Sequence, residues 1–296
     1  MKTLLSFLLV TACLAPGQAA TTISPGNHFS YGANVGWMDW RGDTSSGAVL
    51  GQFVCSGFIW AANIGWINLG AGTPANGIRY LNNSASDFGV NHDGAGTLSG
   101  YAWGANVGWI TFTNRDALGA LYDGPKVDLF TGKLSGLLWG ANVGWINLSN
   151  AFAFVQTGTL VAGADSDGDG IPDAWELVHF GNLTTATATS DFDCDGFTDR
   201  QEYQADTDPR DAASLLRITS YAAALGGSSA DITWTSRPTR QYRVLMRTDL
   251  NPGSPWSDIG LGFVLPDGGA TTARHFTDSP SPQRFYRIEA AIPLGP

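Results

Sequence analysis

In four short segments of the first half of the chain, apolar and aromatic residues alternate with small or polar ones, the pattern of half-buried β-strands. The segments read YGANVGWMDW, WAANIGWINL, WGANVGWITF and WGANVGWINL, and they begin at Tyr31, Trp60, Trp103 and Trp139. Asparagine and glycine at their centres favour a turn, because both residues tolerate left-handed backbone conformations. Each segment is therefore predicted to form a β-hairpin that turns at Gly-Ala-Asn or its equivalent.

The four hairpins make an internal repeat over residues 22–160. If the turn has three residues, Trp103 is expected opposite Val107, and alternation then puts Trp103 and Trp109 on one face. The first unit lacks an evident leading strand, and residues 151–156 (AFAFVQ) could supply it from the far end of the repeat. That exchange would close the units into a propeller-like ring, and an open stack is the alternative; the sequence does not decide between them.

The repeat places paired aromatic rings at equivalent positions, and this pairing has two interpretations. The tryptophans of the last three units are Trp60, Trp66, Trp103, Trp109, Trp139 and Trp145. We expect them mainly to pack between units, since one hairpin cannot bury its apolar face alone. The alternative is a ligand-binding platform for sugars, because flat rings suit the faces of a glycan. Both interpretations hold if one ring of each pair is buried and the other is exposed.

Two acidic stretches follow the repeat, DSDGDGIPDAWE at residues 165–176 and DFDCDGFTDRQE at residues 191–202. Each has carboxylates at positions 1, 3, 5, 9 and 12 and glycine at position 6. Calcium binds six to eight oxygens, so alternate side chains of a tight loop must turn inward. We predict two Ca²⁺ ions, with the residue at position 7 contributing its carbonyl. The predicted ligands are Asp165, Asp167, Asp169, Ile171, Asp173 and Glu176, and Asp191, Asp193, Asp195, Phe197, Asp199 and Glu202.

A short helix is predicted after each loop, over residues 173–180 and 199–205. The preceding segments carry no apolar stripe at helical spacing, so the loops are EF-hand-like without being full EF-hands. The loop–helix form resembles the calcium repeats of dockerins and thrombospondin type 3 segments. This resemblance covers residues 165–211 and implies that calcium orders a linker.

From residue 215 onward, short alternating strands are separated by turn clusters such as Gly226-Gly227-Ser228. This pattern predicts a small antiparallel sandwich over residues 215–293, with Trp234 and Tyr242 in its core. The expected fold class is therefore mainly β: a repeat β domain, a short α calcium-loop segment and a small antiparallel β-sandwich. The sandwich resembles fibronectin type III-like modules.

The N-terminal segment indicates where in or outside the cell the protein is expected. Residues 1–20 read as a secretory signal peptide, with Lys2 before an apolar run and small residues near the end. We expect a secreted or cell-surface protein, for which a lipid anchor at Cys13 is the less favoured form. Beyond the signal, no stretch is long and apolar enough to span a bilayer as a helix. Cys55 and Cys194, the other cysteines, are expected to be unpaired and partly buried.

The net charge is −10, and 13 of the 26 acidic residues lie between residues 165 and 211, which argues against nucleic acid as a partner. The hairpin repeat resembles W-G-A-N-V-G-W-I repeats of exported bacterial surface proteins. We therefore expect a calcium-binding, non-catalytic adhesion or binding protein whose partner is a polysaccharide or a cell-envelope component.

The alternative function is an extracellular glycan-degrading enzyme with two carboxylates on the repeat domain. The candidates are Asp39, Asp43, Asp87, Asp93, Asp116 and Asp123. The sequence contains no nucleophile elbow, phosphate loop, dinucleotide fingerprint or paired zinc histidines. Catalysis is therefore not expected.

Overall fold

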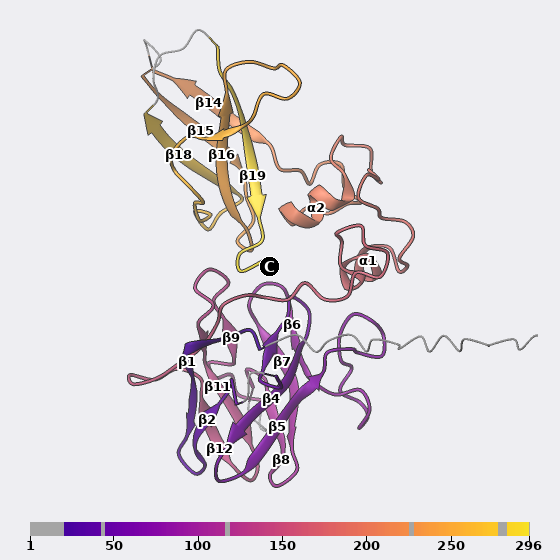
Figure 1. Ribbon diagram of the computed structural model, residues 1–296, viewed down its shortest axis with the longest axis vertical. Helices are drawn as coiled ribbons and strands as arrows, with labels where there is room; N and C mark the ends of the chain where they lie inside the picture. Colours follow the sequence, from indigo (N-terminus) through magenta and orange to yellow (C-terminus); the bar gives the residue numbers. More distant parts are fainter. Residues whose placement is uncertain (1–20, 43–44, 116–118, 225–227, 278–282, 296) are drawn as a thin grey trace, which may run out of the picture.

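The computed structural model describes residues 21–42, 45–115, 119–224, 228–277 and 283–295. It is mainly β, with antiparallel sheets and two short helices, which confirms the predicted fold class. Three parts follow one another along the long axis: a strand-rich first part, a loop segment with both helices, and a second β part (Figure 1). The predicted signal peptide and Cys13 lie outside the described residues.

The first part contains strands β1 to β13 among the residues described. They are β1 (Ile23–Gly32), β2 (Gly36–Asp39), β3 (Val49–Leu50), β4 (Cys55–Ala61), β5 (Gly65–Ala71), β6 (Val90–His92), β7 (Leu98–Gly104), β8 (Gly108–Phe112), β9 (Lys126–Val127), β10 (Leu134–Ser135), β11 (Leu137–Gly140), β12 (Gly144–Asn147) and β13 (Val155–Thr157). The predicted hairpins are β1–β2, β4–β5, β7–β8 and β11–β12.

These four hairpins form a closed sheet. The strands pair in the order β12-β11-β8-β7-β5-β4-β2-β1, and β12 pairs back to β1. The units thus close, but as one continuous sheet and not as a propeller-like ring. The prediction that the first unit lacks a leading strand was wrong, because β1 is that strand. The segment that was expected to replace it contributes β13, which pairs with the N-terminal half of β1. Closure leaves no unpaired edge among these eight strands.

The hairpin register differs by one position from the predicted register. Trp103 lies opposite Trp109, not opposite Val107, because the three loop residues are Ala105, Asn106 and Val107. Gly104 accepts a hydrogen bond from the Val107 amide at 3.1 Å, and Gly108 follows with φ +80°. This is a tight turn followed by a left-handed glycine, a common three-residue hairpin connection.

The interior of the closed sheet is filled by the aliphatic residues between the tryptophans. The inward cross-strand pairs of the last three hairpins are Ile59–Ile67, Ala102–Ile110 and Leu138–Ile146, and all six residues are buried. In the first hairpin Ser30 lies opposite Met38, and its hydroxyl accepts a hydrogen bond from the buried Trp40 indole at 2.9 Å. Side chains of this size fill an eight-stranded closed sheet without leaving a channel.

The repeated asparagines form a ring of hydrogen bonds at one end of the closed sheet. Each side-chain amide donates to the backbone carbonyl in the turn of the preceding hairpin, and the first hairpin donates to the fourth. The four bonds are Asn63 to Val35 at 3.0 Å, Asn106 to Ile64 at 3.1 Å, Asn142 to Val107 at 3.0 Å and Asn34 to Val143 at 3.2 Å. The asparagine of the repeat therefore joins each unit to its neighbour, besides forming the turn.

The prediction that the repeat tryptophans are mainly buried between units was wrong. Five of them are between 38% and 45% exposed on the outer face, and the sixth, Trp139, is half-buried. Rings of one hairpin do contact each other, with centroids 4.8 Å apart for Trp60 and Trp66 and 4.7 Å for Trp103 and Trp109. These rings pack within hairpins or against loop rings such as Phe88, and the core is mainly aliphatic, with Trp40 and Phe112 as its buried rings.

The last part contains two three-stranded antiparallel sheets, as the sandwich prediction requires. One sheet is β14 (Ile218–Ala223), β15 (Ser229–Thr235) and β18 (Thr271–Thr277), and the other is β17 (Ser257–Asp258), β16 (Gln241–Arg247) and β19 (Phe285–Ala291). Trp234 and Tyr242 are fully buried between them, as predicted.

The two helices are α1 (Asp173–His179) and α2 (Asp199–Ala205), close to the predicted ranges. No helix among the described residues has the length and apolarity needed to cross a membrane. Both cysteines within the described ranges are unpaired, as predicted; Cys55 is buried, but Cys194 is exposed rather than partly buried.

Candidate calcium centre and aromatic belt

Both acidic loops fold in the same way around their first aspartate. In the first loop, the Asp165 carboxylate accepts backbone hydrogen bonds from Gly168 at 2.8 Å and Gly170 at 3.0 Å. In the second loop, Asp191 accepts from Asp195 at 3.2 Å and Gly196 at 2.9 Å. These bonds curl the chain, so that the carboxylates at positions 1, 3 and 5 converge.

The convergence gives one cluster in each loop. One oxygen from each of Asp165, Asp167 and Asp169 lies within 4.8 Å of the others, and Asp191, Asp193 and Asp195 form the equivalent cluster. The sixth residue is glycine in both loops, with φ +88° at Gly170 and +95° at Gly196. Only glycine adopts these backbone angles without steric cost, so the sharp turn of the loop depends on it.

The glutamate at position 12 of each loop comes from a helix and is fully buried. Glu176 lies in α1 and Glu202 in α2, and they are 0% and 1% exposed. Neither oxygen of Glu176 has a hydrogen-bond partner among the described residues, nor does Oε2 of Glu202. Buried oxygens of Asp169, Asp193 and Asp195 also lack partners there. Burying a carboxylate without a partner is energetically costly, so these oxygens are well suited to act as ligands of a cation.

The electrostatics of the two glutamates fit the same conclusion. Burial, followed by the charges of the nearby loop aspartates, raises the pKa of Glu176 to about 7. Burial also raises the pKa of Glu202 to about 8, although the Thr207 hydroxyl donates a hydrogen bond to it. Without a cation, the surroundings of each glutamate therefore favour the protonated, neutral form of its carboxyl group. A divalent ion would reverse this preference.

The ninth position of each loop has protein partners. The Asp173 carboxylate accepts hydrogen bonds from the amide and the hydroxyl of Ser166, at 2.7 Å and 2.5 Å. Asp199 accepts from the Phe192 amide at 3.2 Å and the Ser190 hydroxyl at 2.5 Å. In EF-hand loops this position often binds calcium through a water molecule. Direct ligation by Asp173 and Asp199 stays a prediction, as does ligation by the carbonyls of Ile171 and Phe197.

The comparison with known families rests on this geometry. The sequence model of the bacterial TSP3 repeat matches residues 165–181 and 191–212. Both loop–helix segments resemble bacterial TSP3 repeats. Such repeats bind calcium and are typical of extracellular proteins, which supports the predicted calcium segment. No curated protein and no solved structure matches the chain.

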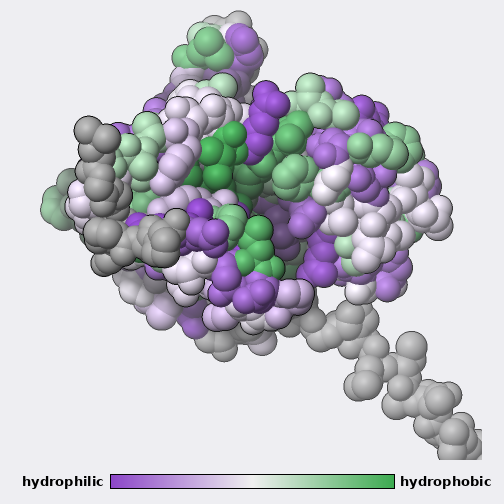
Figure 2. Space-filling view, turned by 90° about the horizontal axis from the view of Figure 1, so that it is seen from above, coloured by the Kyte–Doolittle hydropathy of each residue, from purple (hydrophilic) through white to green (hydrophobic). Residues whose placement is uncertain are grey.

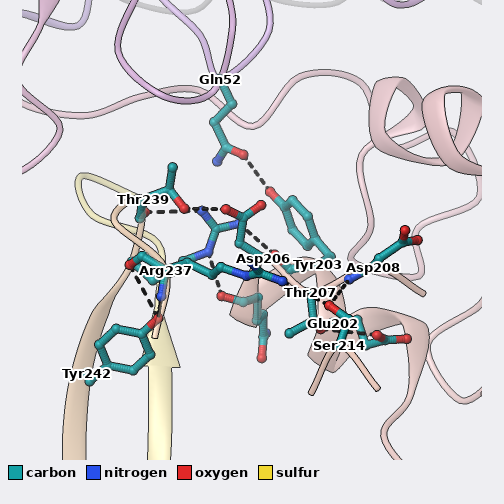
Figure 3. A network of polar contacts seen from close by, with 12 residues as sticks. Gln52, Glu202, Tyr203, Asp206, Thr207, Asp208, Ser214, Arg237, Thr239 and Tyr242 are labelled. Atoms are coloured by element: carbon teal, nitrogen blue, oxygen red, sulfur yellow. Dashed lines mark hydrogen bonds and ion pairs between the residues drawn. The ribbon is translucent and has the colours of Figure 1, made fainter. Parts of the chain in front are cut away.

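The TSP3-like segment contacts both β parts through α2 (Figure 3). The Tyr203 hydroxyl donates a hydrogen bond to Gln52 of the closed-sheet part at 2.8 Å. From the sandwich, the Arg240 guanidinium donates to the carbonyls of Tyr203 at 2.8 Å and Gln204 at 2.7 Å, and the Thr239 hydroxyl donates to Asp206. Because Glu202 precedes Tyr203, the second calcium loop is directly joined to this contact network.

A second candidate site is the outer surface of the closed sheet near its hairpin turns. We name the outward rings at these repeat positions the aromatic belt: Tyr31, Trp37, Trp60, Trp66, Trp103, Trp109, Trp139 and Trp145. The hairpin turns lie at the end of the closed sheet away from the helices and the sandwich (Figure 1). Seen from the opposite end, the surface mixes apolar and hydrophilic patches (Figure 2). Apart from the half-buried Trp139, the rings of the belt are exposed, so the belt is accessible to a partner.

Sequence reasoning missed how polar residues are placed in this belt. Each outward row across three strands has a polar side chain between two larger apolar ones. The rows are Phe29–Asp39–Trp60, Phe58–Asn68–Trp103, Tyr101–Thr111–Trp139 and Leu137–Asn147–Tyr31. The signal was present, since the residue two positions after each second tryptophan is Asp, Asn or Thr.

The candidate carboxylates of the enzyme alternative that lie within the described residues form hydrogen bonds or ion pairs with nearby groups. Asp39 accepts from the Arg41 amide and pairs with His28 at 2.6 Å. Asp87 and Asp93 accept backbone amides of their own loops, and Asp123 pairs with the nearby Lys126. Asp43 and Asp116 lie outside the described residues.

Proposed function

We propose that this chain is an extracellular, non-catalytic binding protein that presents the aromatic belt to polysaccharide. The observation that carries the proposal is the exposure of large rings on the outer face of the closed sheet, whose core is already supplied by other, mainly aliphatic residues. Contiguous exposed aromatic surface on a folded protein is typical of interaction sites. Sugar rings combine an apolar face with hydroxyl groups, which suits rings interleaved with Asn, Thr and Asp.

In this proposal the TSP3-like segment binds two Ca²⁺ ions and fixes the sandwich relative to the closed sheet. The support is the continuous network from Glu202 through Tyr203 to Gln52 and Arg240. The C-terminal end adds a second link, since the Leu294 carbonyl accepts hydrogen bonds from the Leu160 amide and the Thr159 hydroxyl. The proposed location is outside the cell, either secreted or held at the cell surface.

The experiment is retention of the full-length protein on insoluble polysaccharides in calcium buffer, with soluble sugar measured in the same tubes. Retention without sugar release is the expected result. The control is a variant with Trp60, Trp103, Trp109 and Trp145 replaced by serine, which should be folded but not retained. Release of sugar would contradict the non-catalytic proposal, and equal retention of the variant would contradict the role of the belt.

A further inference from the structure

The four rows of the belt are related by the repeat, and one of them lines a well-formed hollow. A hollow of about 590 Å³ lies over β8 and is lined by Tyr101, Trp109, Thr111, Thr113, Trp139 and Asn142, among others. It contains the whole Tyr101–Thr111–Trp139 row. Ligand sites in proteins are commonly hollows of 300–1,000 Å³ with aromatic walls and a few placed polar groups.

We propose that this hollow, the β8 groove, is the principal site for one glycan chain. The inference rests on the proposed function and assigns it to particular residues. Thr111 lies between the side chains of Tyr101 and Trp139 on adjacent strands. The two flanking strands are about 10 Å apart, twice the usual strand spacing. A sugar ring can lie between the aromatic walls with its hydroxyls facing Thr111.

Trp109, one aromatic wall of the β8 groove, is held in place by its neighbours before any ligand arrives. The Trp109 ring meets Trp103, Tyr101 and Phe88 edge to face, with centroid distances of 4.7, 6.0 and 5.1 Å. Trp109 is nevertheless 45% exposed, so part of its surface is open to a ligand. A ring fixed by its neighbours loses little rotamer freedom on binding, which favours affinity.

The polar groups of the β8 groove are suited to hydroxyl recognition. Thr111 and Thr113 follow one another on the outward side, since Ile110 and Phe112 are buried inward. The one described cation in the lining is Arg115, whose Nη1 donates to the Gly119 carbonyl at 2.9 Å, and the described lining contains no carboxylate. The groove is therefore compatible with neutral sugars and with uronic acids.

The equivalent row of the first two hairpins provides a matched contrast. Its polar residue, Asp39, is already bonded to His28 and to the Arg41 amide. The adjoining backbone at Gly42 passes close to the rings of the second hairpin, where a Cβ atom would lie 3.0 Å from Trp66. This row has aromatic residues at the same positions, with Phe29 in place of Tyr101, but no free polar centre, and we expect it to contribute less to binding.

The test compares two tryptophans at equivalent repeat positions, one in each row. Affinity electrophoresis of the full chain in calcium buffer would use gels containing soluble β-glucan, xylan, glucomannan or polygalacturonate. We expect Trp139→Ala to weaken retardation at least about tenfold in the gel that retards the parent protein, and Thr111→Val to weaken it severalfold. Trp60→Ala, in the belt but outside the groove, should weaken retardation clearly less than Trp139→Ala, and Phe152→Ala, an exposed ring outside the belt, should leave it unchanged. Thermal unfolding of each variant checks that the fold is retained.

The outcomes separate this inference from the function on which it rests. If the parent protein binds a glycan but Trp60→Ala weakens it as much as Trp139→Ala, or Trp139→Ala has no effect, the β8 groove assignment is wrong while glycan binding stands. If none of the four soluble polysaccharides, nor the insoluble ones, retains the parent protein, the proposed function fails and the groove assignment fails with it. Retardation by polygalacturonate alone would identify the ligand as an acidic glycan.

Discussion

The closed sheet and the TSP3-like segment reach an ordered structure by opposite means. The closed sheet places 27 buried residues in one apolar cluster, and its hairpins are tied to one another by the asparagine ring. The TSP3-like segment has four buried residues in its cluster and ten carboxylates in its two loops. We therefore expect the first region to fold on hydrophobic burial alone and the second to need an ion to offset its own charge.

The largest expected effect is therefore that of calcium removal, confined to one region. At a hundredfold excess over its dissociation constant, each ion stabilises the bound form by about 2.7 kcal/mol, or about 5 kcal/mol for two. Excess EDTA should make trypsin cleave after Arg200 and Arg210 at least about a hundredfold faster, as followed by gel electrophoresis and mass spectrometry. Cleavage after Lys126 and Lys133 in the closed-sheet part serves as the internal control.

Two outcomes would break the comparison. Unchanged digestion at Arg200 and Arg210 in EDTA would mean that calcium does not order the TSP3-like segment. Equal acceleration at Lys126 and Lys133 would mean that the closed sheet is not independent of the ion.

The next effect concerns the two faces of the closed sheet. Ile110→Ala empties a buried inward position and should destabilise the closed sheet by about 2–5 kcal/mol. Trp109 is the outward neighbour of Ile110. Trp109→Ala removes a larger side chain, but its ring contacts are only partly buried, so the free energy of unfolding should fall by only about 1 kcal/mol. Urea unfolding followed by circular dichroism gives both values. If Trp109→Ala lowers the free energy of unfolding more than Ile110→Ala does, the tryptophans contribute to the core after all.

This contrast explains how far the sequence could predict the closed sheet. Turn residues and alternation are local, so the hairpins and the shared face of Trp103 and Trp109 were predictable. Both faces of each hairpin are apolar, however, and alternation alone does not say which one points inward. The interior of an eight-stranded closed sheet admits Ile, Leu and Ala but not three indole pairs and a Tyr–Trp pair. Closure itself depends on β1 pairing with β12, which no local pattern encodes.

The two candidate sites also differ in how far local sequence patterns could predict them. The two loops and their carboxylate clusters at positions 1, 3 and 5 were predictable, because these side chains lie close together in the sequence and calcium sites favour this spacing. The complete set of ligands stays a prediction. The Tyr101–Thr111–Trp139 row joins three strands and was not predictable, since its register depends on where the turn begins. The one-residue error in the turn was enough to lose it.

A single carboxylate can sharpen the role of the ion. Glu202→Gln should abolish binding at the second loop in calcium buffer, at a cost of about 2.7 kcal/mol under the same excess. In EDTA the same substitution should stabilise the segment at pH 8, because it removes a buried charge. Calcium titration by isothermal calorimetry and trypsin cleavage after Arg200 measure the two effects. Asp231→Asn, an exposed carboxylate of the sandwich, is the control.

The pH dependence has a definite sign. Glu202 has its pKa raised from 4.5 to about 8 in the folded segment, so the folded form holds the proton more tightly than the unfolded form. Without calcium, the contribution of Glu202 to the stability of the folded segment is therefore fully present below pH 4.5. This contribution is lost as the pH rises toward 8. With calcium, protons compete with the ion and the trend reverses. A calcium-free segment that gains stability between pH 5 and 8 would contradict the burial of an unpaired Glu202.

The smallest effect tests the asparagine ring, the feature that makes the closed sheet continuous. Asn106→Asp keeps the shape of the side chain but replaces the amide that donates to the Ile64 carbonyl with an acceptor. We expect a loss of about 1 kcal/mol in urea unfolding, the usual contribution of one hydrogen bond, growing as the pH rises through the aspartate pKa. Asn76→Asp is the matched control, because Asn76 uses its oxygen to accept from the Ile78 and Arg79 amides. If both substitutions cost the same, the ring contributes no specific stability, and the repeated asparagine serves the turn alone.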